Sequence, residues 1–201
     1  MNIPNKLTVL RILLVPFFVF FLLSTYIPHS YLIAGIVFAI ASITDMLDGK
    51  IARKYNLITD FGKFADPLAD KILVVAAFLC FVQLGIMGAV PVIIVLFREF
   101  SVTSIRLVAA SNGDVVAANI WGKIKTVSQI IAIGFILLFQ YILQLVNYNI
   151  IKLTPENING LTYGLNITSE VLIYISVVLT LISGVIYIKD NFKFIKNTKW
   201  N

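Results

Sequence analysis

Charged residues are scarce in this sequence: they make up 13% of its 201 residues, about half of the share that is usual in soluble globular proteins. Apolar residues make up 59%, and the mean hydropathy is +0.94. A soluble globule of this composition would expose large apolar patches to water, so that class of protein is excluded. We therefore expect one integral membrane domain that comprises residues 1–201.

Cysteine and sequence repeats are also nearly absent. Cys80 is the single cysteine and lies in an apolar run, so no intrachain disulfide can form, and the thiol is expected to pack as a small hydrophobic group. No internal repeat is visible, which gives no support to a duplicated transporter architecture. The net charge of +6 does not indicate a nucleic-acid partner, because the cations border apolar runs, where anionic lipid headgroups are the expected contact.

Six apolar runs are long enough to predict transmembrane helices, since a helix needs about 20 residues to cross a bilayer. The predicted fold is therefore an all-α polytopic membrane protein with six transmembrane helices. The runs cover about residues 9–26, 31–54, 68–87, 90–110, 130–146 and 171–188.

The charges between these runs predict how the chain is oriented. One side of the predicted membrane carries few titratable groups, namely His29, Lys152, Glu156 and Glu170, and the Asn-rich stretch 147–168 on that side is expected to be an external loop. By the positive-inside rule, the basic side and both termini face the cytoplasm. The basic side carries Lys6, Arg11, Lys50, Arg53, Lys54, Lys63, Lys71, Arg106, Lys123, Lys125, Lys189, Lys193, Lys196 and Lys199.

Four aspartates are expected at membrane depth. Only residues 31–43 of the second run are continuously apolar, which is too short for a crossing, so the helix must continue past Asp45 and Asp48. These two carboxylates share one helical face. In the third helix, Asp66 and Asp70 lie four residues apart and also share a face.

Two interpretations of these acids stay open at this point. In the first, they are interfacial residues or helix caps that reach water. For Asp66 itself, the sequence allows either an N-cap of a helix with Pro67 at its first position or a place inside a helix that begins near Phe61 and is kinked by Pro67. However, each acid near mid-membrane costs on the order of 3 kcal/mol, so four of them call for cationic compensation. Oxygen ligands that converge from two helices suit hard divalent ions such as Mg²⁺ or Mn²⁺, and four carboxylates could hold two ions.

The stretch that contains these aspartates follows the pattern D-x2-D-G-x2-A-R-x8-G-x3-D-x3-D at every fixed position. This pattern resembles the signature of the CDP-alcohol phosphotransferase family. The resemblance implies transfer of a phosphatidyl or similar group from a CDP-linked donor to an alcohol, with release of CMP, by a homodimeric membrane enzyme. The fixed residues are Asp45, Asp48, Gly49, Ala52, Arg53, Gly62, Asp66 and Asp70.

The resemblance also implies a role for each of these residues. Asp70 corresponds to the general base, and two Mg²⁺ or Mn²⁺ ions would grip the donor diphosphate. The metal ligands would be Asp45, Asp48, Asp66 and Asp70. Gly49, Ala52 and Gly62 would leave space for the cytidine, and Arg53 would hold the nucleotide end. The residues that bind the CDP donor would thus be Asp45, Asp48, Gly49, Ala52, Arg53, Gly62 and Asp66.

Further stretches bear on the acceptor alcohol. Arg98 interrupts the apolar part of the fourth helix, where an unpaired cation is costly, so it must face a partner or a cavity. It could pair with an acid such as Glu99, or it could join Arg106, Lys123 and Lys125 in a basic pocket for an acceptor that carries phosphate. The stretches 5–8 with Arg11, 98–100 with Arg106, and 122–126 with Gln129 resemble the branch of the family that forms phosphatidylglycerophosphate.

We therefore expect CDP-diacylglycerol as donor and glycerol 3-phosphate as acceptor. The alternatives are another acceptor, such as inositol phosphate, serine or phosphatidylglycerol, or a divalent-cation transporter. Ion conduction fits intramembrane carboxylates but gives no reason for the spacing of Gly49, Ala52, Arg53 and Gly62.

Overall fold

The computed structural model describes residues 2–55, 60–111, 113–114 and 119–192; within these, the side chains of residues 3–4, 48–55, 60–67 and 70 lie outside the description. This part of the chain is all helical, as the sequence predicts, and contains no strand. The helices are α1 (Ile3–Leu23), α2 (Ser30–Tyr55), α3 (Asp60–Gln83), α4 (Ala89–Ser111), α5 (Ile120–Asn147) and α6 (Pro155–Asp190).

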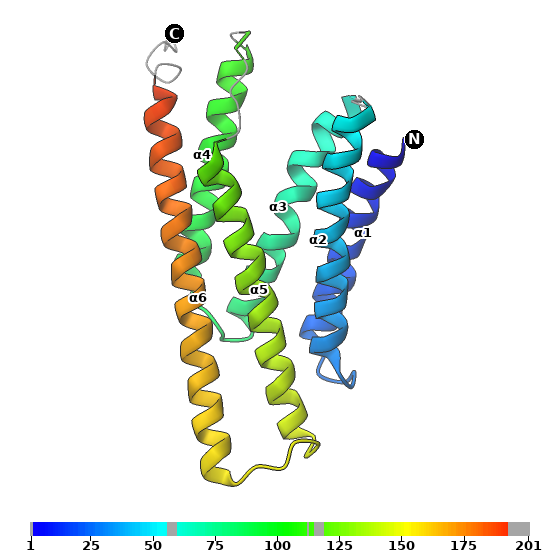
Figure 1. The fold of residues 1–201 in the computed structure, drawn as a ribbon, viewed down its shortest axis with the longest axis vertical. Helices are drawn as coiled ribbons and strands as arrows, with labels where there is room; N and C mark the ends of the chain where they lie inside the picture. Colours follow the sequence, from blue (N-terminus) through cyan, green and yellow to red (C-terminus); the bar gives the residue numbers. More distant parts are fainter. Residues whose placement is uncertain (1, 56–59, 112, 115–118, 193–201) are drawn as a thin grey trace.

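The helices run alternately up and down the molecule (Figure 1). α1 packs on α2 and α3, and α6 packs on α4 and α5. The two groups are joined by contacts of α2 with α5 and of α3 with α4 and α5. As a result, α1 begins and α6 ends at the same end of the bundle, where α2 and α4 also end. We call this the basic end, because the helix ends that lie there carry cations, among them Lys6 on α1, Arg106 on α4 and Lys189 on α6.

Four helices are long and apolar enough to cross a membrane, within Asn5–Leu23, Ser30–Leu47, Ile120–Asn147 and Pro155–Asp190 among the described residues. The apolar stretch Lys71–Gln83 of α3 is shorter. In α4 the apolar sequence is interrupted by Arg98, Glu99 and Arg106. The multi-pass character of the chain is therefore supported, whereas the number of six crossings stays a prediction.

Aromatic and branched side chains fill the centre of the bundle. Phe18, Phe78, Phe81, Ile133 and Ile136 are fully buried and belong to one core cluster that draws on α1, α3 and α5. Cys80 is buried in the same cluster, as its apolar neighbours in the sequence predict. Because lipid is as apolar as these side chains, close packing rather than escape from water holds such helices together.

The prediction of an external loop over residues 147–168 is wrong for most of that stretch. α6 begins at Pro155, so only the first third of the stretch connects two helices. Thr154 is the N-cap, Pro155 occupies the first turn, and Glu156 places a negative charge there. These are favourable helix-start features, which outweigh the polar, Asn-rich composition.

The first residues of α3 and α5 also differ from, or decide between, the sequence predictions. α3 begins at Asp60, so Pro67 lies inside the helix and Asp66 is not an N-cap. α5 begins at Ile120, ten residues before the apolar run at 130, because the side chain of Asn119 caps it by accepting a hydrogen bond from the Trp121 amide at 3.3 Å. This early start places Lys123 and Lys125 on the helix.

Candidate functional site

The aspartate motif lies on two helices that are consecutive in the chain. α2 runs through Tyr55, so it carries Asp45 and Asp48 within the helix, as the sequence predicts. α3 carries Asp66 and Asp70. Asp48, Gly49, Ala52, Arg53, Gly62, Asp66 and Asp70 have side chains outside the described part of the structure, so their predicted roles stay predictions.

Asp45 is the motif aspartate whose side chain is described, and it forms an ion pair with α1. Nη1 of Arg11 lies 2.6 Å from Oδ1 of Asp45. The Arg11 side chain is 1% exposed and that of Asp45 is 36% exposed, so a buried cation holds one oxygen of a carboxylate that still reaches the surface. Arg11, which the sequence resemblance connected with the acceptor, therefore contacts the aspartate motif directly.

The donor set of the motif fits a hard divalent ion, because carboxylate oxygens are the ligands that Mg²⁺ and Mn²⁺ prefer. Asp45 contributes such a carboxylate at a partly exposed position. The described side chains contain no group of three or more His, Cys, Asp or Glu residues that could hold a metal, and Asp48, Asp66 and Asp70 are outside them. The dinuclear site is thus a prediction of the motif.

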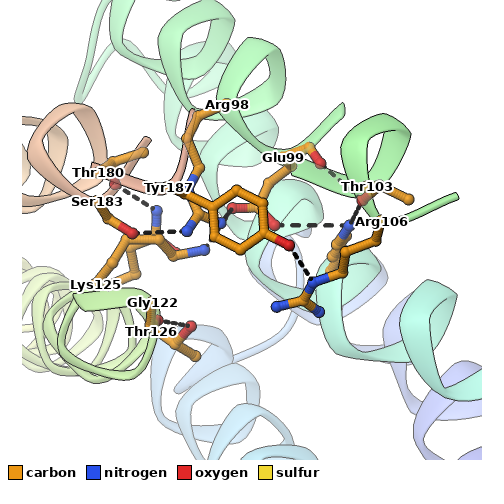
Figure 2. Close-up of polar contacts among 12 residues, drawn as sticks. Arg98, Glu99, Thr103, Arg106, Gly122, Lys125, Thr126, Thr180, Ser183 and Tyr187 are labelled. Atoms are coloured by element: carbon orange, nitrogen blue, oxygen red, sulfur yellow. Dashed lines mark hydrogen bonds and ion pairs between the residues drawn. The ribbon is translucent and has the colours of Figure 1, made fainter. Parts of the chain in front are cut away.

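A second group of polar side chains is buried where α3, α4, α5 and α6 meet (Figure 2). Its centre is Glu99, whose Oε1 lies 2.9 Å from Nη1 of Arg98 and accepts a hydrogen bond from Nζ of Lys125 at 2.6 Å. Oε2 of Glu99 lies 3.7 Å from Nζ of Lys71. We call this group the Glu99 cluster; it consists of Lys71, Arg98, Glu99, Thr103, Lys125 and Ser183.

The cluster holds more positive than negative charge. Lys71, Arg98 and Lys125 face the single carboxylate of Glu99, so these four side chains carry a net charge of +2. Arg98, Glu99 and Lys125 are 9%, 7% and 6% exposed, whereas the side chain of Lys71 is 33% exposed. Buried charge that is not fully paired is expensive. An anion of charge close to −2 would therefore bind favourably here.

Arg98 is fixed at both its head and its stem by α6. Its Nη2 donates a hydrogen bond to Oγ of Ser183 at 2.6 Å. At Gly184 a Cβ atom would lie 3.0 Å from Cγ of Arg98, so the absence of a side chain there makes room for the arginine stem. Its Nε is buried and has no hydrogen-bond partner among the described residues, so the guanidinium has donor capacity beyond these contacts.

Arg106 and Lys123, the other two predicted acceptor residues, are not members of the Glu99 cluster. Arg106 donates from Nε to the hydroxyl of Tyr187 at 3.1 Å, and its guanidinium lies over the Tyr187 ring at 5.6 Å. Figure 2 shows this pair beside the Glu99 cluster. Lys123 is exposed, and among the described residues it has no contact with the cluster. Of the four predicted acceptor residues, the structure therefore joins Arg98 and Lys125 directly and places Arg106 nearby.

Sequence reasoning considered Glu99 as a partner of Arg98 but missed its contact with Lys125. It also missed Lys71, Ser183 and Tyr187. The signal for the α6 residues was weak: Ser183 and Tyr187 lie four residues apart, on one helical face, within an otherwise apolar helix. The pairing of Arg98 with Glu99 is one of the two interpretations that the sequence left open, and the structure contains it.

Comparison with known proteins identifies the family. Residues 1–182 match the family model described as CDP-alcohol phosphatidyltransferase. A protein of Bacillus subtilis (strain 168) named CDP-diacylglycerol--glycerol-3-phosphate 3-phosphatidyltransferase is 40% identical, and the match covers 98% of each chain. Proteins of the same name from Haemophilus influenzae and Rickettsia felis are 37% and 34% identical, with 94% of this chain and 92% and 94% of theirs covered. The chain therefore belongs to the CDP-alcohol phosphatidyltransferase family, as its aspartate motif predicts.

Proposed function

We propose that this protein transfers the phosphatidyl group of CDP-diacylglycerol to glycerol 3-phosphate, which yields phosphatidylglycerophosphate and CMP. As a member of its family the chain is a multi-pass membrane transferase. The names of the relatives above support this particular donor and acceptor. The observation that carries the acceptor assignment is the net charge of +2 in the Glu99 cluster, in which Arg98 and Lys125 are buried and Lys71 is partly exposed.

The charge of the cluster matches the acceptor. A phosphomonoester carries a charge of about −1.5 to −2 near neutral pH, because its second pKa is near 6. Arg98 suits such a group, since a guanidinium can form two parallel hydrogen bonds to phosphate oxygens. Serine carries no phosphate and no net charge, so it would leave the positive charge that Glu99 does not balance without an anionic partner. This disfavours serine as the acceptor.

Lys71 links the acceptor cluster to the aspartate motif. It directly follows Asp70 on α3, and its ammonium nitrogen reaches both Glu99 and Thr103 on α4. Lys71 and the predicted base Asp70 are therefore adjacent residues of one helix, which supports an acceptor site close to the aspartate motif. We propose that the acceptor phosphate binds at the Glu99 cluster and that the free hydroxyl of the three-carbon acceptor extends from there toward Asp70.

The reaction itself is an in-line displacement at phosphorus. The primary hydroxyl of glycerol 3-phosphate loses its proton to Asp70, and its oxygen forms a new bond to the β-phosphorus of CDP-diacylglycerol. The bond from that phosphorus to the bridging oxygen breaks, and CMP leaves with the electron pair. Divalent ions, when bound by the motif carboxylates, supply neutralisation of the charge on the diphosphate.

The orientation and assembly belong to the same proposal. The basic end faces the cytoplasm, where the positive-inside rule places cation-rich connections. Both substrates then approach from that side, the lipid donor laterally and the soluble acceptor from water. We also propose that two Mg²⁺ or Mn²⁺ ions occupy the motif and that the enzyme is a homodimer, as the family resemblance implies.

The test is turnover by the purified protein in detergent or lipid nanodiscs. CMP release from CDP-diacylglycerol is measured with glycerol 3-phosphate, inositol phosphate, serine and phosphatidylglycerol as separate acceptors. The proposal expects kcat/KM to be highest with glycerol 3-phosphate and the lipid product to be phosphatidylglycerophosphate. A preference for another acceptor would refute the acceptor assignment, and no CMP release with any acceptor would refute the transferase assignment.

A further inference from the structure

Glu99 presents an apparent contradiction if its surroundings bind an anionic acceptor. A carboxylate inside a phosphate site repels the ligand, and the site would attract phosphate more strongly without it. Glu99 is nevertheless central: it is 7% exposed and contacts cations from three helices, namely Lys71 on α3, Arg98 beside it on α4 and Lys125 on α5. Its presence therefore calls for a function that outweighs its unfavourable charge.

We propose that Glu99 is a positioning residue for the acceptor phosphate: it does not bind the acceptor but holds Arg98 and Lys125 in the geometry in which they bind it. This inference rests on the function proposed above and deepens it. The geometric basis is that both cations contact the same oxygen of Glu99, at 2.9 Å for Arg98 and 2.6 Å for Lys125.

A shared oxygen fixes the distance between two groups that would otherwise move apart. The guanidinium and the ammonium carry like charges, and in a buried site of low dielectric constant their repulsion is strong. Both side chains are long and lose much of their rotamer entropy when they are held in one conformation. Glu99 holds them before the acceptor arrives, so the acceptor does not have to order them itself.

The remaining donors of both cations stay available to a ligand. An arginine head has five N–H donors and a lysine has three, and each contributes one hydrogen bond to Glu99. Arg98 donates a further hydrogen bond, from its second terminal nitrogen, to Ser183 on α6. The head of Arg98 is thus held from two sides, by Glu99 and by Ser183, with its planar fork in a set orientation.

Two substitutions of Glu99 separate positioning from charge. Glu99→Gln keeps the size of the side chain and removes the charge, whereas Glu99→Asp keeps the charge and withdraws the carboxylate by one methylene group. If Glu99 positions the cations, both substitutions raise the KM for glycerol 3-phosphate. We expect an increase of about tenfold, because each substitution weakens the charged hydrogen bonds that hold Arg98 and Lys125 in place. The KM for CDP-diacylglycerol should stay within about twofold in both variants, because the donor is assigned to the aspartate motif.

A role as a simple counter-charge gives a different pattern. Glu99→Gln would then lower the acceptor KM, since the cluster gains a net positive charge, and Glu99→Asp would leave it unchanged. A purely structural role would lower the melting temperature and the total activity without separating the two KM values. Either pattern would overturn the proposal.

Ser183→Ala keeps the test decisive if the Glu99 variants do not fold. This variant preserves every charge of the cluster and removes only the second support of Arg98, so it should raise the acceptor KM by about threefold and leave the donor KM unchanged. Combined with Gly184→Ala, which would press on the Arg98 stem, the effect should grow. An unchanged acceptor KM in a folded Ser183→Ala variant would overturn the positioning of Arg98 in the same way.

The controls distinguish this inference from the function on which it rests. Lys152→Ala removes an exposed lysine from the connection between α5 and α6, at the end of the bundle away from the cluster, and should change neither KM. If wild-type protein does not release CMP with glycerol 3-phosphate, the proposed function itself fails. If the wild type does so and the Glu99 and Ser183 variants retain its acceptor KM, only the positioning role fails.

Discussion

Replacement of Arg11 should destabilise the contact between α1 and α2 through Asp45. The perturbation is Arg11→Met, which keeps most of the apolar stem and removes the charged head. Nη1 of Arg11 lies 2.6 Å from Oδ1 of Asp45 in the wild-type protein, and the arginine is 1% exposed. Without Arg11, the carboxylate keeps its charge but loses this partner.

The size of the effect follows from the exposure of the two groups. Loss of one partner from a fully buried ion pair costs about 3–5 kcal/mol, because a buried charge remains uncompensated. Asp45 is 36% exposed and can regain water on one side, so we expect a smaller cost for the pair, about 2 kcal/mol. For a chain of this length, that corresponds to a decrease of about 4–8 °C in Tm.

The assay is a double-mutant cycle read by thermal melting in detergent. Arg11 is buried and has further interactions besides the pair, so the single variant alone would overstate the contribution of Asp45. Comparison of Arg11→Met, Asp45→Asn and the double variant isolates the coupling between the two side chains. Lys152→Met, which removes an exposed lysine, serves as the matched control and should leave Tm unchanged.

The expected result is a double variant that is clearly less destabilised than the sum of the two single variants. Arg11→Lys should keep part of the stability, because it retains the charge but loses the planar guanidinium. Additive effects of the two single substitutions, within about 0.5 kcal/mol, would show that the pair contributes no coupling and would refute this reasoning.

Three other predictions concern the reaction. Chelation of divalent ions should abolish CMP release, and Asp45→Asn should reduce it by orders of magnitude because a neutral amide is a poor Mg²⁺ ligand; full activity after exhaustive chelation would contradict a metal-dependent mechanism. Asp70→Asn should abolish transfer while binding of CDP-diacylglycerol, measured with Mg²⁺ present, largely survives; a folded variant that no longer binds the donor would make Asp70 primarily a ligand. Arg106→Ala should raise the KM for glycerol 3-phosphate more than that for CDP-diacylglycerol, with partial rescue by Arg106→Lys, and an unchanged acceptor KM would place Arg106 outside the acceptor site.

The presence of the helices could be predicted from the composition of the sequence. Apolar runs predict helices in a membrane because every backbone polar group must find a partner within its own segment, and the structure is helical over the described residues. The ends of the helices were less accessible. Residues 155–170 are polar, so hydropathy did not assign them to α6, although Thr154, Pro155 and Glu156 form a helix start that could have been recognised.

The aspartate motif was also accessible, because its spacing within one stretch of chain carries the family resemblance. The partner of Asp45 was not, since Arg11 lies far away in the sequence and only the packing of α1 on α2 brings the two together. The side chains of the other motif aspartates lie outside the described part of the structure, so their arrangement remains a prediction from the sequence.

What the sequence determined by itself is the class of protein and its family: the scarcity of charge requires a membrane environment, and local helical spacing places acids on common faces. Tertiary structure alone decided what the buried cations contact. Arg98 had two open interpretations, and both were reasonable because a sequence does not show which helix faces meet. The packing of α3, α4, α5 and α6 around Glu99 brings three cations to one carboxylate, since a buried charge is tolerated only where neighbouring helices supply its partners.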